Sequence, residues 1–197
     1  MEVAWLLVVP AYLLGTFPTA LLVGRRAGRD PTQEGSGNPG ASNAFRTMGR
    51  RAGATVLLGD VAKGALAAGV GSLAGSRAVG VACGLAAVLG HVAPVTRRFR
   101  GGKGVATGAG VAAVLLPIPA LVLAGVWLAA VKATGTAAAG SVAVALGFPL
   151  GALFTGRPAW EVAAFALCGL LVVIRHHGNL GRLRRGEERS LNPRASG

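Results

Sequence analysis

The chain has 197 residues, of which 52% are hydrophobic and only 14% are charged, well below the roughly 25% charged residues of a typical soluble domain. This composition, with its positive mean hydropathy, excludes an ordinary water-soluble domain and indicates a protein embedded in membrane lipid. A net charge of +13 also suits nucleic-acid binding. The basic residues, however, lie in short clusters between apolar stretches, as in membrane proteins, so we expect no nucleic-acid partner.

Long apolar stretches predict the membrane-spanning helices, because a helix needs about 20 apolar residues to cross roughly 30 Å of hydrocarbon. The stretch over residues 105–131 is too long for one span, and Pro117 and Pro119 divide it into two short or tilted helices. We therefore predict an all-α integral membrane protein with seven transmembrane helices, short or broken central spans, and a single domain over residues 1–197. The other predicted spans cover residues 3–24, 54–75, 78–95, 136–154 and 158–174.

The positions of the basic residues orient these spans, since cytoplasmic loops carry an excess of Lys and Arg. If the N-terminus lies outside, 17 of the 20 Lys and Arg residues fall on the inside, including Arg194. Lys63 lies within a span, and only Arg77 and Arg157 lie outside. We therefore predict an outside N-terminus and a cytoplasmic C-terminus. The first stretch lacks a basic leader, so we expect a retained anchor rather than a signal peptide.

A glycine-rich run fills the longest predicted inside loop, from Glu34-Gly35-Ser36-Gly37-Asn38-Pro39-Gly40 to Arg46. Glycines let backbone N–H groups approach an anion closely. Ser36 and Asn38 can donate hydrogen bonds, and Arg46 can bind a phosphate with two N–H groups. The same residue types also form ordinary solvated turns, so this run by itself leaves both interpretations open.

Three further polar clusters lie near the same predicted inner boundary. Asp60 and Lys63 are three residues apart in the second span, so they share a helix face and can form an ion pair. This pair is either purely structural or lines a polar cavity. The run Gly101-Gly102-Lys103-Gly104 precedes a predicted helix, whose N-terminus favours an anion. Residues 175–180, Arg-His-His-Gly-Asn-Leu, follow the last span. Together these donor-rich clusters predict a phosphate-binding cavity on the inside.

In these motifs the chain resembles the acyl-phosphate-dependent glycerol-3-phosphate acyltransferases of bacteria, the PlsY family. The glycine-rich run is similar to the first family motif, the Asp60 to Gly64 segment to the second, and the segments around His91 and Lys103 to the third. The resemblance covers nearly the whole chain. The matching segments are residues 35–43 with Arg46, 60–64, 90–94, 99–107 and 175–180 with Arg182 and Leu183.

The chain departs from the family's pattern at two places. The family often has two serines three residues apart at the start of the sixth helix, whereas this chain has Ala138 and Ser141. Only Ser141 is therefore carried over as a candidate. Thr96, Arg97 and Arg98 replace commonly apolar positions, which makes the linker inside the third motif more polar.

The resemblance implies a multi-pass enzyme of the bacterial cell inner membrane, with an outside N-terminus and an active site that faces the cytoplasm. It implies transfer of a fatty acyl group from acyl phosphate to the 1-hydroxyl of glycerol 3-phosphate, which gives lysophosphatidic acid and phosphate in the first acylation step of phospholipid synthesis. The expected partners are the two substrates and membrane lipid. We expect no cofactor, and buried free thiols at Cys83 and Cys168. The sequence does not fix protein partners or oligomeric state and is compatible with a monomer.

The motifs and the resemblance also give candidate site residues. We expect the glycine-rich loop to hold the donor phosphate, and the third motif and C-terminal cluster to hold the glycerol phosphate. Which phosphate Arg46 and Lys103 each prefer is left open. His91 is either a structural histidine or a general base that competes with the donor phosphate for the proton. The candidate catalytic residues are Ser36, Arg46, His91 and Lys103. The candidate substrate-binding residues are Gly37, Asn38, Gly40, Asn43, Lys63, Gly101, Gly102, Ser141, His176 and Asn179, and no metal ligands are expected.

An anion or organophosphate transporter is the rival interpretation, since intramembrane charges and basic inner loops also serve permeation. Transport needs a route through both faces of the membrane. The predicted outer loops are short and contain only Arg77 and Arg157 as basic residues. The distribution of polar residues therefore favours an enzyme that works from one face.

Overall fold

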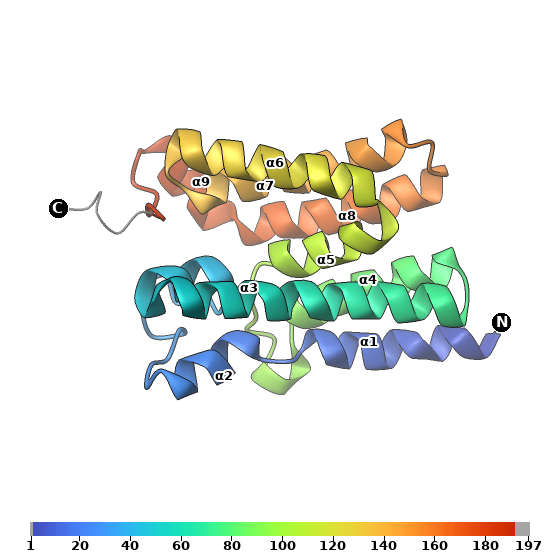
Figure 1. Ribbon diagram of the computed structural model, residues 1–197, viewed down its shortest axis with the longest axis horizontal. Coiled ribbons are helices and arrows are strands. Elements are labelled where there is room, and N and C mark those ends of the chain that lie inside the picture. The colour runs from blue at the N-terminus through green and yellow to red at the C-terminus, as the bar shows by residue number, and fades with distance from the viewer. Residues whose placement is uncertain (1, 192–197) are drawn as a thin grey trace. The chain divides into compact units, whose positions relative to one another are not determined.

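The computed structural model describes residues 2–191, and every regular element in this range is a helix (Figure 1). The predicted all-α fold is confirmed. The chain divides into two compact units, Met1–Leu115 and Leu116–Gly197, here called the N-terminal unit and the C-terminal unit. Arg194, which the charge pattern places on the inside, lies outside the described residues. Cys83 and Cys168 are buried free thiols, as predicted.

In the N-terminal unit the long helix α3 is the central element. It packs against α4 and α5, and α4 in turn packs against α1. Figure 1 shows α4 and α1 along the later part of α3, which ends at the turn into α4. The described elements of this unit are the 3-10 helix Glu2–Leu7, α1 (Val8–Gly15), α2 (Thr19–Arg26), α3 (Ala41–Ala74), α4 (Arg77–Val92), the 3-10 helix η2 (Val95–Arg97) and α5 (Val105–Leu115).

The first apolar stretch is broken, so the prediction of one continuous helix over residues 3–24 is wrong. α1 ends at Gly15 and α2 begins at Thr19. The cause is Pro18, which has no N–H group and disfavours helical backbone at the preceding residue, Phe17. Thr16 Oγ1 donates to Leu13 O at 2.7 Å and satisfies one carbonyl at the end of α1. Together with the 3-10 helix before them, the two helices still form one candidate span of 25 residues, Glu2–Arg26.

α3 begins at Ala41 rather than at the predicted residue 54, and it is bent. Gly49 inside it has φ +88°, a left-handed conformation that interrupts the helix and that glycine adopts without steric cost. The segment before Gly49 turns back on the segment after it. The close approach of Gly53 and Phe45 shows this, since a Cβ at Gly53 would lie only 2.7 Å from Phe45 Cβ. Three arginines assigned to an inside loop are therefore helical. They are Arg46, Arg50 and Arg51.

Small residues let the helices of this unit approach one another closely. A Cβ at Gly15 on α1 would overlap the Ala87 carbonyl of α4, and a Cβ at Gly64 on α3 would overlap the Thr107 carbonyl of α5. Close backbone contact at small residues is how apolar helices pack in membranes. These contacts fix α1, α3, α4 and α5 around the polar side chains in the middle of the unit.

The C-terminal unit is built around α7, which packs against both α6 and α8. α5 ends at Leu115 and α6 begins at Pro117, so the predicted division of the 105–131 stretch is confirmed. After α9 the chain returns to the turn between α6 and α7, where Leu191 N–H donates to Gly135 O at 2.8 Å. The helices are α6 (Pro117–Thr134), α7 (Ala137–Phe154), α8 (Ala159–Arg175) and α9 (His177–Arg184).

Five helical segments among residues 2–191, with the broken Glu2–Arg26 counted as one, are long and apolar enough to cross a membrane, and α8 with α9, bent by 60°, forms a sixth candidate. On α6, the exposed fractions of Ile118 and Leu121 are 73% and 77%, as expected for a helix that faces lipid. α5 has 11 residues and is therefore about 17 Å long, which is shorter than the hydrocarbon layer. This length agrees with a short central span, while seven crossings remain a prediction.

Candidate active site

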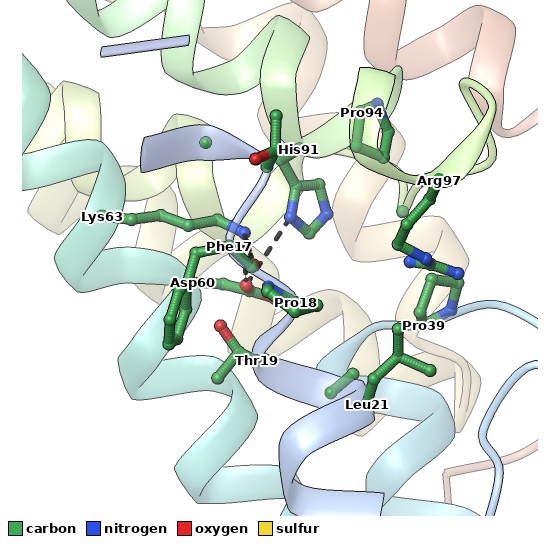
Figure 2. A pocket seen from close by; sticks show the side chains of 14 residues that line it. Phe17, Pro18, Thr19, Leu21, Pro39, Asp60, Lys63, His91, Pro94 and Arg97 are labelled. Atoms are coloured by element: carbon green, nitrogen blue, oxygen red, sulfur yellow. Dashed lines mark hydrogen bonds and ion pairs between the residues drawn. The ribbon is translucent and has the colours of Figure 1, made fainter. Parts of the chain in front are cut away.

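Three titratable side chains meet in the middle of the N-terminal unit. Asp60 and Lys63 lie one turn apart on α3, and His91 comes from the last turn of α4. Lys63 Nζ lies 2.9 Å from Asp60 Oδ1, and His91 Nδ1 lies 3.6 Å from the same oxygen (Figure 2). The residues are only 2%, 4% and 9% exposed, in the order Asp60, Lys63, His91. The predicted ion pair on α3 is confirmed, and His91 is added to it by the packing of α4 on α3.

Lys63 has a second contact that depends on the break between α1 and α2. Its Nζ donates to Phe17 O at 3.3 Å. A buried ammonium group needs such hydrogen bonds to offset its loss of hydration. The sequence signal for this contact is Thr16-Phe17-Pro18, a proline turn inside an apolar stretch, and hydropathy alone does not reveal it.

Gly101 and Gly102 wrap around His91. Gly102 N–H donates to His91 O at 3.0 Å. A Cβ at Gly102 would overlap His91 Nε2, and a Cβ at Gly101 would overlap His91 O. Only glycine permits so close an approach at both positions. This contact explains both glycines without a substrate, so their role in substrate binding remains a prediction.

A small cavity opens beside the Asp60 cluster (Figure 2). Its volume of about 20 Å³ is enough for one water molecule or one ligand oxygen. The Thr19 hydroxyl oxygen is buried here and has no hydrogen-bond partner among residues 2–191. Within the described chain the lining includes Thr19, Pro39, Asp60, Lys63, His91, Arg97 and Gly102.

This cavity brings together residues of all three sequence motifs. Pro39 belongs to the glycine-rich loop, Lys63 to the second motif, and His91 and Gly102 to the third. Other candidates from the same motifs lie elsewhere in the N-terminal unit, with Arg46 on the first segment of α3 and Lys103 directly before α5. The described residues that line the cavity do not include Ser36, Arg46 or Lys103.

Asn43 shapes the glycine-rich loop from within. Its side chain is buried, and its Oδ1 accepts from Ser36 N–H at 2.9 Å. Its Nδ2 donates to Pro31 O at 2.9 Å and to Glu34 O at 3.0 Å. A carboxamide has only two N–H hydrogens to donate. Asn43 therefore has no donor left for the phosphate contact predicted from the sequence, and its role in this conformation is to fix the loop.

The other candidates of the glycine-rich loop differ in what they can still offer a ligand. Gly37 N–H donates to Glu34 O and Gly40 N–H donates to Asn38 O, so both N–H groups are used inside the loop. Ser36 Oγ accepts from Asn38 N–H at 3.4 Å and donates to no other described residue. The Ser36 hydroxyl hydrogen and the Asn38 Nδ2 group, neither of which donates to another described residue, thus remain available for a phosphate oxygen.

Two predicted substrate-binding residues of the C-terminal unit are buried and partnered. Ser141 Oγ donates to Ala137 O at 2.8 Å and accepts from Trp127 Nε1 at 3.4 Å. His176 Nδ1 lies 2.8 Å from Val172 O. Because a carbonyl oxygen can only accept, Nδ1 carries the hydrogen, and in the neutral ring Nε2 is an acceptor.

The third candidate of this unit, Asn179, is part of a polar cluster with the chain that follows α9. Its Nδ2 donates to Glu188 Oε1 at 2.7 Å, and Arg182 Nε donates to Glu188 Oε2 at 2.9 Å. Asn179 and the Glu188 side chain are both nine-tenths or more buried. Within residues 2–191 no group of three or more His, Cys, Asp or Glu side chains is arranged to hold a metal ion.

Apolar helices around a buried polar cluster define this chain as a multi-pass membrane protein with an internal site. It belongs to the glycerol-3-phosphate acyltransferase family, whose model matches residues 5–186. The chain is 40% identical to glycerol-3-phosphate acyltransferase of Bacillus cytotoxicus, over 98% of this chain and 97% of that protein. It is 41% identical to the same enzyme of Syntrophomonas wolfei, over 99% and 100% of the two chains.

Two solved structures are similar to this chain, both of PlsY (YgiH), an integral membrane glycerol 3-phosphate acyltransferase. The glycerol 3-phosphate form has a TM-score of 0.93 and 33% identity, and the match covers 98% of this chain and 97% of the other. The lysophosphatidic acid form has a TM-score of 0.89 and 33% identity, over 96% of both chains. The chain is therefore an acyltransferase, and the predicted family and enzyme class are confirmed.

Proposed function

We propose that this chain transfers a fatty acyl group from acyl phosphate to the 1-hydroxyl of glycerol 3-phosphate, with lysophosphatidic acid and phosphate as products. The proposal places the reaction at the cytoplasmic face of the bacterial inner membrane, in a single domain that crosses the bilayer seven times from an outside N-terminus. The observation that carries it is the meeting of all three motifs at one buried polar cavity, through Pro39, Lys63 and Gly102. The glycerol 3-phosphate and lysophosphatidic acid forms of PlsY support the choice of acceptor and product.

Both proposed substrates carry phosphate, and the hydrogen-bond donors of the candidate site suit phosphate oxygens. In the N-terminal unit the Ser36 hydroxyl, Arg46 and Lys103 would hold phosphate by charge-assisted hydrogen bonds. In the C-terminal unit Ser141, His176 and Asn179 remain proposed contacts of the glycerol phosphate. Because Asn179 also donates to Glu188, substrate binding there shares a hydrogen-bond network with the segment that follows α9.

The chemistry requires positioning and charge stabilisation more than a protein nucleophile. Acyl phosphate is already activated, so the 1-hydroxyl oxygen can attack the acyl carbonyl carbon directly. The bond from that carbon to the phosphate oxygen then breaks, and the phosphate accepts the proton of the attacking hydroxyl. Cationic and hydroxyl donors aimed at the phosphate stabilise the charge that develops on it.

The surroundings of His91 support this substrate-assisted proton transfer over a histidine base. A general base must reach the substrate hydroxyl within about 2.6–3.2 Å. His91 Nδ1 faces Asp60 at 3.6 Å, and Nε2 is packed against the Gly102 backbone. Both ring nitrogens are thus directed at the protein, which favours a structural part for His91 in holding α3, α4 and the third motif together.

The donor specificity is tested with purified protein in detergent. Acyl phosphate and glycerol 3-phosphate should give lysophosphatidic acid and inorganic phosphate in equal amounts. Acyl-CoA or acyl carrier protein in place of acyl phosphate should give no product. Product from acyl-CoA alone would refute the proposed donor. Because detergent solution has no second compartment, product formation also separates an enzyme from the rival transporter.

A further inference from the structure

Arg97 contributes a cation to the cavity from the linker inside the third motif, at a position where this chain departs from the family pattern. It lies at the end of η2 and lines the same cavity as Lys63 and His91. Figure 2 shows its side chain extending toward Pro39, on the other side of the cavity from Lys63. The side chain is half-buried, and within residues 2–191 its guanidinium makes neither a hydrogen bond nor an ion pair. It is a positive group directed at a buried site and not held by a carboxylate.

Asp30 is the acidic group that acts on Arg97, and it does so from a distance beyond an ion pair. The Asp30 carboxylate accepts from Thr32 Oγ1 at 2.7 Å and from Thr32 N–H at 2.9 Å. These hydrogen bonds hold the pKa of Asp30 below its usual value. Asp30 is therefore ionised near neutral pH and attracts Arg97, but it leaves the guanidinium hydrogens available to a ligand.

Thr19 provides an independent sign of a ligand in the same cavity. Its buried hydroxyl oxygen has no partner in the described chain, whereas buried polar atoms nearly always have one. The cavity volume of about 20 Å³ admits a single oxygen atom and not a whole substrate. Lys63 balances Asp60, so Arg97 leaves the lining with a net positive charge. The small volume and the positive lining fit one oxygen of an anion. That oxygen would lie against Thr19, with Arg97 beside it.

We propose that this cavity is a phosphate subsite, in which one phosphate oxygen accepts from the Thr19 hydroxyl and the Arg97 guanidinium binds the same phosphate group. The inference rests on the proposed function, since both substrates and both products carry phosphate. The chemistry that these ligands share is the phosphate group, whether the ligand is a phosphate monoester, an acyl phosphate or inorganic phosphate. Arg97 and Thr19 are then substrate-binding residues in addition to the candidates that the matching motif segments gave.

Binding of inorganic phosphate and of glycerol 3-phosphate to the full-length protein in detergent tests the subsite without turnover. By calorimetry, Arg97→Leu should weaken the Kd for the ligand that occupies the cavity about 10-fold, the scale of one charge-assisted hydrogen bond. Arg97→Lys should lie between Arg97→Leu and the natural protein, because an ammonium group keeps the charge without the planar fork. Thr19→Val should weaken the same Kd about threefold or more.

The matched control is Arg98→Leu, since Arg98 is the exposed neighbour of Arg97 and lies outside the cavity lining. This variant should bind phosphate within about twofold of the natural protein. Equal affinities for Arg97→Leu and Arg98→Leu would overturn the subsite, and so would a Thr19→Val variant with unchanged affinity, which would leave water as the occupant. Equal thermal unfolding of the two arginine variants checks that each is folded.

Steady-state kinetics then identify which phosphate occupies the cavity. An increase in KM confined to glycerol 3-phosphate assigns the acceptor, an increase confined to acyl phosphate assigns the donor, and weaker inhibition by inorganic phosphate alone assigns the product. A KM unchanged for both substrates, together with unchanged phosphate inhibition, contradicts the subsite. A natural protein that binds phosphate but transfers no acyl group would refute the proposed function and leave the binding result intact, so the two failures are distinguishable.

Discussion

Replacing Asp60 with asparagine should destabilise the N-terminal unit by about 3–5 kcal/mol, the usual cost of leaving one partner of a buried ion pair alone. The side chains of Asp60 and Lys63 are 3% and 4% exposed and lie 2.9 Å apart. At an effective dielectric constant of about 20, two unit charges at this distance attract by about 6 kcal/mol. Asparagine keeps the shape of the side chain but removes its charge. Lys63 then retains the Phe17 carbonyl as the contact that offsets its lost hydration.

Thermal unfolding of the detergent-solubilised protein measures this cost. By the scaling for chains of this size, Asp60→Asn should lower Tm by about 6–20 °C. Lys63→Met alone should have a comparable effect, because it leaves the buried carboxylate with His91 at 3.6 Å. The double variant, which contains no buried ion pair, should recover most of the Tm. It should not recover acyl transfer, since Lys63 is a proposed substrate contact.

The matched control is Asp30→Asn, which removes a carboxylate that is exposed and in no ion pair among the described residues. Its Tm should change by less than about 2 °C, as for most surface substitutions. An Asp60→Asn variant with an equally small change would refute the reasoning. The reasoning would also be refuted if the double variant had a Tm no higher than that of the less stable single variant. The loss of stability would then not come from an unpaired buried charge.

Three further substitutions test separate parts of the site. Gly102→Ala should lower stability by about 1–3 kcal/mol, since its Cβ would overlap the His91 ring; an unchanged Tm would contradict this packing. His91→Gln should keep at least about a tenth of the acyl-transfer rate, whereas loss of a general base costs roughly 10²–10⁴-fold in both His91→Gln and His91→Ala. Arg46→Lys should reduce kcat/KM for acyl phosphate about 10-fold or more, because a point charge cannot reproduce the guanidinium fork; near-normal kinetics would rule out that role.

Proline and hydropathy allowed part of the fold to be predicted from the sequence. The division between α5 and α6 follows from Pro117 within a stretch too long for one span. The break at Pro18 has the same cause but lies inside a stretch of ordinary span length, so apolar content gave no reason to divide it. The early start of α3 was missed because Arg46, Arg50 and Arg51 make that segment look like a loop. Its helical form depends on packing, as when Ala44 packs with Ala20 and Val56.

The candidate site shows the same limit. The Asp60–Lys63 pair follows from spacing within one helix, so the sequence was sufficient to predict it. The approach of His91 to Asp60 depends on how α4 packs on α3, which no local pattern encodes. Asn43 has the composition of a phosphate ligand, and only its three hydrogen bonds reveal a loop-fixing role. Arg97 reads as a topology signal in the sequence, and its place in the cavity comes from the turn that follows Pro94.

The imidazole ring of His91 has no room to rotate about its Cβ–Cγ bond. Gly102 lies against its Nε2 edge, Asp60 stands on its Nδ1 side, and the residue is 9% exposed. A histidine that ferries protons by turning from one partner to another needs free rotation about its Cβ–Cγ bond. In this protein the ring is held in one orientation between Asp60 and Gly102, so it cannot pass a proton from one partner to another by rotating.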